Sequence, residues 1–526
     1  MRPVDTEVLV VGAGPVGLTL AIALGQAGVR CTLVERKPAP QFLPKMERCN
    51  ARTMEIFRRM GIAARVRAAG LPAEVPMDVY IIQAMDRAPL LRFPHPSVDA
   101  ARREIDACTD GSLPLEPYQL ISQYTLEPLL KAEAERLADV QFGSEFLSLT
   151  QDASGVSAAI STNGKTREIR SHYLVACDGG GSTVRQQLGI SLEGEGDILR
   201  LRQALYRCDE LFERIPIGPG PGRGRHYHVA DGQATFLIMQ DSTRHWTLHA
   251  TLERDEDMAA QFEKTLGVPM KYEMLYVGEW KQNLLLAERY RERRVFLAGD
   301  AVHLMIPTGG LGMNSGVGDA VDLAWKLAGT LRGWGGPRLL DSYQAERRPI
   351  GERNVAASRY ASQGRRKWRS LWRDLDQLVE AARVEQPKSN EMIGAELGYR
   401  YAGSPLIAEE PGGPEDDFRR YVPGTWPGTR LPHVWLDGHV AMQDRLGPGY
   451  TLLRLGRTAE DTMGLEGAMR ARGAPFAVLD IADAAARDLC GFDLILLRPD
   501  LHVAWRGNRA PEAPAKLAAR VSGHLE

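Results

Sequence analysis

The first 35 residues constrain the fold more than any other part of the chain. Residues 7–12 form a short apolar run rich in β-branched side chains that ends in glycine, which is typical of a buried parallel strand. Apolar residues then recur with helical spacing over residues 15–27, and Gly28 ends the predicted helix. Residues 30–35 form a second predicted strand. This order of strand, helix and strand makes a βαβ unit and predicts an α/β fold.

The turn between this strand and helix carries the glycine pattern of a dinucleotide-binding loop. Gly12, Gly14 and Gly17 match G-x-G-x-x-G, in which the glycines permit a tight turn, close approach to a pyrophosphate and close helix–strand packing. Glu35 ends the second strand eighteen residues later, where a carboxylate accepts hydrogen bonds from ribose hydroxyls. The motif alone leaves FAD and NAD open. The predicted dinucleotide-binding residues of this segment are Gly12, Gly14, Pro15, Gly17, Glu35 and Arg36.

A second glycine-rich region favours a flavin over a nicotinamide cofactor. An apolar strand ends in Gly299-Asp300, which places a carboxylate where the ribityl hydroxyls of a flavin would lie. The glycines of residues 307–314 delay any regular element until a helix predicted at 316–327. Such a turn presents free N–H groups and a positive helix end, as the anionic edge of a reduced flavin requires. The predicted flavin-binding residues here are Gly299, Asp300, Pro307, Gly310, Gly312, Met313 and Asn314.

The pattern of apolar residues divides the chain into segments of different character. Strand–loop–helix patterns in residues 1–190 return in 285–360, which predicts a discontinuous cofactor-binding domain. Alternation typical of antiparallel strands dominates 191–284, the predicted substrate-binding domain. Residues 361–402 are charged and helical and are expected to form a bridge. Residues 403–526 give strand and helix patterns of a separate C-terminal α/β domain.

Charge and cysteine content exclude several classes of function. Lys and Arg number 65 against 67 Asp and Glu, so no basic excess indicates a nucleic-acid partner. Six scattered cysteines, without a C-x-x-C pair or metal-ligand spacing, predict reduced thiols, no metal site and a cytoplasmic location. No leader with a cleavage site is recognised, and no apolar run approaches the ~20 residues of a membrane helix, so we expect no membrane partner.

Taken together, these segments resemble the class A flavoprotein aromatic hydroxylases. The similarity covers nearly all of residues 5–360 and is closest to the branch with 3-(3-hydroxyphenyl)propionate, phenol-type and polyketide hydroxylases. Residues 427–433 and 497–506 resemble the C-terminal thioredoxin-like domain of that branch. The resemblance implies a Rossmann-like FAD-binding domain, interrupted by an antiparallel-sheet domain that covers the substrate. Cys490 is alone in the tail, which excludes dithiol chemistry there.

The resemblance implies an FAD-dependent monooxygenase that hydroxylates a phenolic aromatic substrate. In this family NAD(P)H binds transiently and reduces a non-covalently held FAD. O₂ then adds at the flavin C4a position, and the hydroperoxide delivers OH to an electron-rich ring. The sequence does not settle the substrate, the position of hydroxylation or the choice between NADH and NADPH. It does not settle the oligomeric state either, with which a homodimer is compatible.

Other functions stay open at this point. Another FAD oxidoreductase, a halogenase-like enzyme or an oxidase, would share the dinucleotide motif, although the W-x-W-x-x-I-P segment of halogenases does not occur. A plain NAD dehydrogenase would leave Gly299-Asp300 and the glycines after it unexplained. A non-catalytic flavin-binding protein would keep the motifs but show no substrate-stimulated oxygen uptake.

The resemblance also implies roles for individual residues. Asp178, in an Asp-Gly-Gly-Gly-Ser segment, and Gln123 match family positions near the flavin. Lys45 aligns where many relatives carry arginine, and lysine supplies a point charge instead of a planar fork. Pro307 and Gly310 are expected to act catalytically beside the flavin.

Two further predictions concern polar residues outside these motifs. His226 and His228 alternate along a predicted strand and therefore project to one face. His226 is the candidate catalytic residue that contacts substrate, although ordinary polar residues between domains explain the pair as well. The basic stretch 365–369 is predicted to be a solvated helix face, with an anion or membrane-surface role as the alternative.

Overall fold

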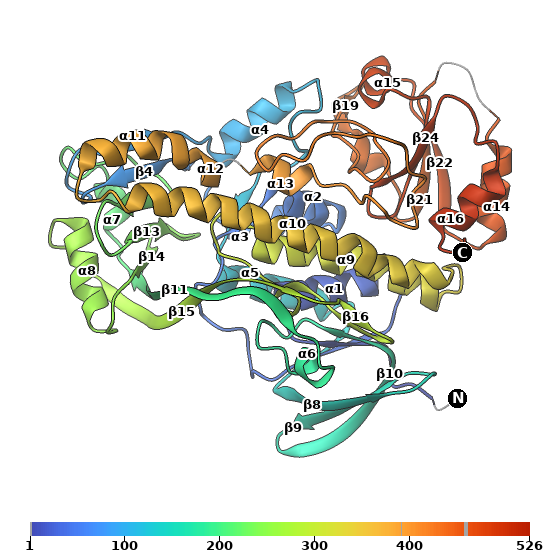
Figure 1. Ribbon diagram of the computed structural model, residues 1–526, viewed down its shortest axis with the longest axis horizontal. Coiled ribbons are helices and arrows are strands. Elements are labelled where there is room, and N and C mark those ends of the chain that lie inside the picture. The colour runs from blue at the N-terminus through green and yellow to red at the C-terminus, as the bar shows by residue number, and fades with distance from the viewer. Residues whose placement is uncertain (1–2, 391, 457–460, 526) are drawn as a thin grey trace.

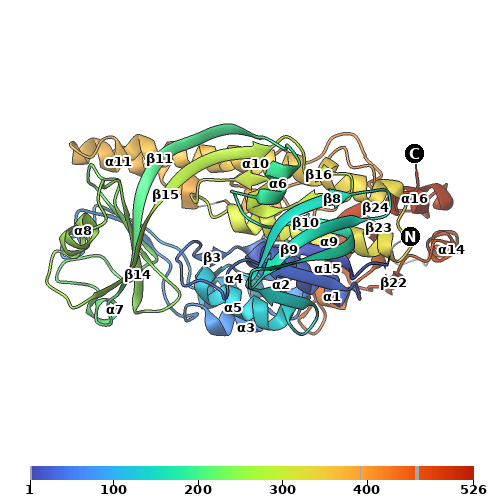
Figure 2. The same cartoon turned by 90° about the horizontal axis from the view of Figure 1, so that it is seen from below.

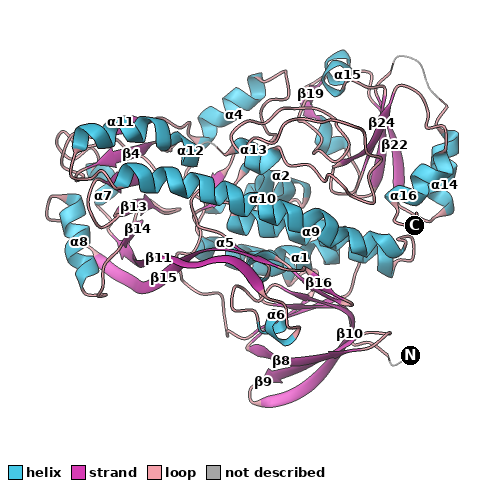
Figure 3. Cartoon of the chain, in the orientation of Figure 1, coloured by secondary structure: helices cyan, strands magenta, loops and turns pink. Residues whose placement is uncertain are grey.

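The computed structural model describes residues 3–390, 392–456 and 461–525. Figure 1 shows a mixed α/β molecule crossed by one long helix, α10 (Pro337–Arg369), with a separate small sheet at the C-terminal end. Figure 3 shows that the strands gather below this helix, at its far end and in the C-terminal part. No helix within the described ranges combines the length and apolar composition needed to cross a bilayer.

The first sheet is built around the N-terminal βαβ unit. β1 (Thr6–Val11) lies between β2 (Cys31–Glu35) and β10 (Lys165–Ala176) and runs parallel to both. All three strands are buried over most of their length, because helices cover the faces of a parallel sheet. The sheet order is β16 (Arg291–Glu292), β17 (Val295–Leu297), β10, β1, β2 and β7 (Asp139–Phe142), with β8 (Ser144–Gln151) paired to β9 (Val156–Thr162), which pairs to β10.

Helices pack on this sheet where the glycine pattern leaves room. α1 (Pro15–Gln26) starts directly after the glycine turn and packs against α9 (Gly312–Leu331) and α5 (Gln123–Ala134). At Gly17 a side chain would overlap the carbonyl oxygen of Gly12, so only glycine permits this packing. α2 (Ala51–Arg59) is capped by the Asn50 side chain, which accepts a hydrogen bond from the Thr53 amide at 2.9 Å.

The second sheet is almost entirely antiparallel. Its longest strands, β11 (Leu192–Arg207) and β15 (Glu273–Ala287), pair along most of their length and reach from the first sheet to the far end of the molecule (Figure 2). The order is β18 (His303–Leu304), β15, β11, β14 (His245–Ala250), β13 (Phe236–Met239), β12 (His226–Val229), β4 (Val79–Ile82) and β5 (Leu91–Phe93). Only the β12–β4 pairing is parallel among these described strands.

Strand pairing links segments on both sides of the predicted domain divisions at residues 190 and 285. β4 and β5 come from the first segment and β18 from the returning one, yet all three extend the second sheet. They cover edges of β12 and β15 whose backbone N–H and C=O groups would otherwise lack partners. Strand pairing alone therefore does not mark the predicted domain boundaries at residues 190 and 285.

The predicted helical bridge at 361–402 is continuous with the preceding segment. α10 already begins at Pro337 and runs for 33 residues, about 50 Å of helix. α11 (Leu375–Glu385), α12 (Pro387–Asn390) and α13 (Ile393–Leu397) follow, and α11 packs back against α10. One rigid element thus joins the two ends of the molecule.

The C-terminal domain has the thioredoxin-like topology that the resemblance implied. Its strands lie in the order β22, β21, β23, β24, with β21 parallel to β22 and the other pairs antiparallel. Helices follow β21, β22 and β24. The elements are β21 (Tyr450–Arg454), α14 (Met463–Ala471), β22 (Phe476–Asp480), α15 (Ala484–Cys490), β23 (Leu494–Leu497), β24 (Val503–Gly507) and α16 (Pro514–Val521). Cys490 is buried and free.

Buried ion pairs fasten this domain to α9 and α10. Arg498, just after β23, donates to Glu346 of α10 at 2.6 Å and to Asp322 of α9 at 3.1 Å. Lys326 donates to the same two carboxylates at 2.6 and 2.7 Å, and Asp500 lies 2.5 Å from Arg498. We call Asp322, Lys326, Glu346, Arg498 and Asp500 the junction cluster. Every charge in it faces an opposite charge.

Candidate active site

A cavity of about 1030 Å³ lies where the two sheets and the last turns of α10 meet. Most of the residues proposed from sequence line it, although they come from segments far apart in the chain. Those that line it are Gly12, Gly14, Pro15, Glu35, Arg36, Lys45, Gln123, Asp178, His226, Asp300, Pro307, Gly310, Gly312, Met313 and Asn314. Gly17 and Gly299 lie behind the wall, where they pack against Gly12 and Val16.

The glycine turn at one end fits the ADP part of a dinucleotide. Gly12 adopts φ +105°, which only glycine takes readily, and a side chain there would overlap the Cys177 carbonyl. A Cβ added to Gly14 would meet no atom within 4 Å, so the turn leaves open space where a pyrophosphate would approach. Glu35 accepts hydrogen bonds from the Ala13 amide at 2.9 Å and the Lys37 amide at 3.0 Å, which fix its carboxylate beside this turn.

The Gly299-Asp300 turn is held from behind by a buried carboxylate. Asp319 of α9 accepts from the Gly299 amide at 3.1 Å, from His303 Nε2 at 2.9 Å and from Arg347 Nε at 2.8 Å. Burial opposes the charge of Asp319, but Arg347 and His303 outweigh it and hold its pKa at about 2. Asp300, by contrast, faces the cavity, and burial raises its pKa although His303 opposes the rise. Within the part of the chain that the structure describes, its carboxylate accepts no hydrogen bond and can therefore bind hydroxyl groups.

The glycine loop that follows is shaped by two side chains. Gly309 and Gly310 take φ +93° and +67°, which the turn into α9 requires. Arg48 donates to the Gly309 carbonyl at 2.5 Å, and Asn314 donates to the Gly310 carbonyl at 2.7 Å. Asn314 therefore lines the cavity, but its side-chain amide donates a hydrogen bond to the loop itself. Pro307 begins the loop on the cavity wall.

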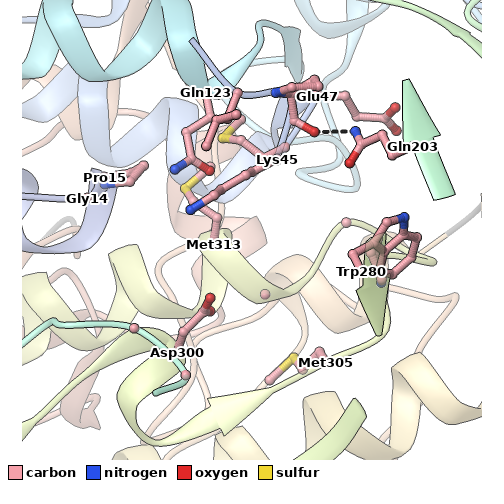
Figure 4. Close-up of a pocket in the computed structure, with 18 of the residues that line it drawn as sticks. Gly14, Pro15, Lys45, Glu47, Gln123, Gln203, Trp280, Asp300, Met305 and Met313 are labelled. Carbon is pink, nitrogen blue, oxygen red and sulfur yellow. Dashed lines mark hydrogen bonds between the residues drawn. The ribbon is translucent and has the colours of Figure 1, made fainter. Parts of the chain in front are cut away.

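α9 begins with its N-terminus at the cavity. Gly312 lies in its first turn, and a Cβ there would meet no atom within 4 Å, so amide groups at the positive end of a 20-residue helix are accessible. Figure 4 shows Lys45, Gln123 and Met313 projecting into the same part of the cavity, opposite Asp300. Gln123 donates to Glu127 at 2.6 Å, which orients its amide.

Asp178 offers a further acceptor on the same wall. One of its carboxylate oxygens accepts from the Val184 amide at 3.2 Å, and the other is buried without a partner among the residues described. Burial raises the pKa of this carboxyl group. Gly179 and Gly181 leave open space beside it. A bound group that donates a hydrogen bond would satisfy the unpaired oxygen.

The opposite end of the cavity is lined by aromatic and apolar side chains from the second sheet. Trp280 donates from its indole N–H to His249 Nδ1 at 3.1 Å, and His249 stacks on Phe236 with ring centroids 4.4 Å apart. Burial lowers the pKa of His249 to about 3, so the ring is neutral and Nδ1 can accept. Figure 4 shows Trp280 and Met305 on the side away from Gly14. These walls suit a flat apolar ligand.

His226 reaches this end of the cavity and is paired with an acid. Its Nε2 lies 2.8 Å from Glu47. Burial opposes ionisation of Glu47, but His226, Arg225 and Arg48 outweigh it and hold the pKa of Glu47 at about 2. Burial also lowers the pKa of His226, although Glu47 opposes that shift. Because an ionised carboxylate only accepts, Nε2–H of a neutral His226 donates, which leaves Nδ1 as an acceptor.

The basic stretch at the end of α10 forms a solvated face only in part, since Arg366 and Lys367 are exposed whereas Arg365 and Arg369 are partly buried. Arg365 and Arg369 line the cavity together with Arg225, which precedes β12, whereas Lys367 is exposed and pairs with Glu385 at 2.8 Å. Spacing by four residues puts Arg365 and Arg369 on one helix face, and packing of α10 over the second sheet turns that face inward.

The expected pairing of His226 and His228 on one strand face is present. Their ring centroids lie 5.8 Å apart. His228 is fully buried and its Nδ1 accepts from Arg369 at 3.0 Å, so His228 positions this arginine and does not line the cavity.

Some functional candidates were missed from sequence. Glu47 lies two residues after Lys45, but nothing near it in the chain indicates its partner His226. Asp319 had a signal, since an acid inside the apolar pattern of α9 is unusual unless it is paired. Arg225 gave none, because a single arginine before a predicted strand is common.

Comparison with known proteins identifies the family. Residues 5–358 match the family described as FAD binding domain, and residues 424–525 match the family described as aromatic-ring hydroxylase, C-terminal. The chain belongs to the FAD-dependent aromatic-ring hydroxylases. These domains confirm the resemblance seen in the motifs and the fold class derived from it. FAD is the cofactor of this family, and the protein is accordingly an FAD-dependent monooxygenase acting on aromatic rings.

Similar hydroxylases match over almost the whole chain. FAD-dependent monooxygenase apdD of Emericella nidulans is 31% identical over 98% of this chain and 90% of its own. Aklavinone 12-hydroxylase RdmE of Streptomyces purpurascens is 32% identical over 100% of this chain and 99% of its own. A ternary complex of aklavinone-11 hydroxylase with FAD and aklavinone superimposes with a TM-score of 0.84, at 29% identity and 99% coverage of both chains.

Proposed function

We propose that this hydroxylase acts on a phenolic ring, with NAD(P)H as electron donor and O₂ as oxygen source. One observation carries the proposal: a single cavity joins the glycine turn at Gly14 to the aromatic walls and His226 of the second sheet. A bound cofactor and an aromatic substrate would therefore meet in one cavity.

The dinucleotide end of the cavity is proposed to hold FAD without a covalent bond. Open space at Gly14 suits the pyrophosphate of FAD. The carboxylates of Glu35 and Asp300 and the unpaired oxygen of Asp178 suit its hydroxyl groups and other donors. Bound FAD would supply the redox chemistry that links NAD(P)H and O₂ to the aromatic ring. The residues proposed to contact or shape its site are Gly12, Gly14, Pro15, Gly17, Glu35, Arg36, Lys45, Gln123, Asp178, Gly299, Asp300, Pro307, Gly310, Gly312, Met313 and Asn314.

The loop before α9 is proposed to stabilise negative charge during catalysis. Pro307 and Gly310 hold it in a conformation that leaves the amides near Gly312 accessible, at the positive end of α9. Lys45 adds a cation opposite Asp300 (Figure 4).

His226 is proposed to contact the phenolic hydroxyl. Its Nε2–H is donated to Glu47, so Nδ1 can accept the hydroxyl proton. Removal of that proton raises the electron density of the ring at the ortho and para carbons. Glu47 stabilises the imidazolium that results, because its ionised carboxylate lies 2.8 Å away.

Oxygen labelling tests the proposal. With purified holoenzyme under ¹⁸O₂, a panel of phenols should include substrates that raise NAD(P)H oxidation by an order of magnitude, about 1.4 kcal/mol of barrier. The product should carry one ¹⁸O atom ortho or para to the hydroxyl. His226→Gln should lower turnover about 100-fold or more, whereas His245→Gln, outside the cavity lining, should not. Label found only in hydrogen peroxide for the whole panel would contradict hydroxylation.

Three further expectations concern the location of the protein, its oligomeric state and its folding units. The cysteines of the described chain are free, which supports a cytoplasmic location. A homodimer is proposed and is tested by sedimentation of the purified protein. The folding units are proposed as 1–190 with 285–360, 191–284, 361–402 and 403–526, and limited proteolysis tests their boundaries.

A further inference from the structure

Three arginines converge on the substrate end of the cavity from two elements. Arg225 immediately precedes β12, and Arg365 and Arg369 lie in the last two turns of α10. All three line the cavity, as does the more exposed Arg366 between them on α10. Their neighbours identify the substrate end, because Arg225 adjoins His226 in sequence and Arg369 lies over the Phe236 ring at 5.2 Å.

Protein groups leave most of their donors unused. Arg365 has no hydrogen-bond or ion-pair partner among the described residues, and the buried Nε atoms of Arg225 and Arg369 also lack one. Arg225 is only 4% exposed and Arg369 donates one bond, to His228 at 3.0 Å. Arg225 is buried and Arg365 and Arg369 are partly buried. A buried donor without a partner costs free energy, which a ligand that accepts hydrogen bonds from these groups would recover.

The acids at this end are already engaged. Glu47 bonds to His226. Asp231 accepts from the amides of Gln233 and Thr235 and from the side chains of Thr235 and Gln261. The arginines therefore outnumber the nearby carboxylates, and neither carboxylate forms an ion pair with them within the described residues.

Helix electrostatics do not account for the arrangement. A helix C-terminus favours basic side chains, but exposed positions serve that purpose, as Lys367 does. Burial lowers the pKa of Arg365 to about 10; Glu47 opposes this shift, and repulsion from Arg225 adds to it. Burial likewise lowers the pKa of Arg369 to about 9, with Arg365 adding. The fold thus maintains like charges at an energetic cost, which indicates an anionic ligand.

We propose that Arg225, Arg365 and Arg369 bind a carboxylate carried by the aromatic substrate, so that the enzyme selects hydroxylated aromatic acids over neutral phenols. This inference rests on the proposed function, since it takes the aromatic end of the cavity as the substrate site. A planar guanidinium matches a carboxylate with two parallel hydrogen bonds. The phosphates of FAD are assigned to the other end, at Gly14 and α9.

Matched ligands test the inference by binding alone. Isothermal titration of FAD-loaded enzyme compares 3-hydroxy-2-naphthoate with 2-naphthol, and anthraquinone-2-carboxylate with anthraquinone-2-carboxamide, without NAD(P)H. Each acid should bind at least about tenfold more tightly than its neutral partner, as charge-assisted hydrogen bonds predict. Arg365→Gln and Arg369→Gln should each remove most of this preference and leave the neutral ligands unaffected. Inorganic phosphate at equal concentration should compete weakly, whereas effective competition would assign the arginines to a phosphate group.

Lys367→Gln is the matched control, because it removes the same charge from the same helix turn at an exposed position. Arg365→Lys should restore part of the preference, since it keeps the charge and loses the fork. Absence of preference, or absence of binding, for both acids would overturn the inference. So would equal losses for acid and neutral ligand in the folded arginine variants. Preference without any ¹⁸O transfer would contradict the proposed function and leave the carboxylate site standing.

Discussion

The junction cluster is a buried group of paired charges, whereas the cavity arginines are a buried or partly buried group of charges that are mostly unpaired within the described residues. In the junction cluster each charge meets a partner between 2.5 and 3.1 Å. In the cavity Arg365 meets none among the residues described, and Arg225 and Arg369 keep unpaired Nε atoms. Paired charges fix the position of two parts of a protein relative to each other. Unpaired charges beside open space are typical of a site that binds a charged ligand.

The largest expected effect separates the two groups by stability. Arg498→Met removes the cation that faces three carboxylates of the junction cluster and leaves Lys326 as the only cation of the cluster to compensate them. It should lower the free energy of unfolding by about 3–5 kcal/mol. Urea unfolding followed by circular dichroism measures the change. A loss below about 1 kcal/mol would show that the pairing does not hold the C-terminal domain in place.

The second prediction concerns a paired charge that supports cofactor binding. Asp319→Asn weakens the three bonds that hold the Gly299-Asp300 turn, so FAD should bind about 10- to 100-fold more weakly. Titration of the apoprotein with FAD measures this, and Asp341→Asn, an exposed acid on α10, serves as control. Unchanged FAD affinity in a folded Asp319 variant would show that the bonds of Asp319 to Gly299, His303 and Arg347 do not support cofactor binding.

The third prediction concerns how the free energy of unfolding depends on pH through Glu47. The pKa of Glu47 is lowered to about 2, so its stabilising contribution is complete above about pH 4.5 and is lost as pH falls toward 2. Glu47→Gln should cost about 1 kcal/mol at pH 7 and flatten the acid loss of stability over that window. Unfolding free energies at several pH values measure it against Glu168→Gln, at an exposed strand position. If the unfolding free energies of both variants change with pH in parallel, Glu47 does not contribute the predicted acid-sensitive stability.

The smallest effect is expected where the charge is unpaired. Arg365→Gln removes no ion pair and relieves repulsion from Arg225 and Arg369, so stability should stay within about 1 kcal/mol of the parent. Differential scanning calorimetry tests this beside the Arg498 variant. A loss as large as that of Arg498→Met would mean that the two groups do not differ in kind.

Local patterns predicted the parts of the fold that depend on neighbours in sequence. The glycine spacing placed β1, α1 and Glu35, and Asn50 marked the start of α2 as its side chain does in the structure. The site depends instead on distant pairs, such as Glu47 with His226 and Arg48 with Gly309. Helical spacing put Arg365 and Arg369 on one face, but only tertiary packing decides that this face turns inward.

The uninterrupted helix α10 also limits which mutations this protein can tolerate in evolution. Its first turn is tied to the chain end, where Arg338 donates its amide to Gly523, while its last turns carry Arg365 and Arg369 into the cavity. Inserting one residue between these anchors would rotate everything beyond it by about 100° and swing both guanidinium groups out of the site. Ligand preference along this helix can therefore diversify through substitutions, while insertions and deletions are confined to loops outside residues 337–369.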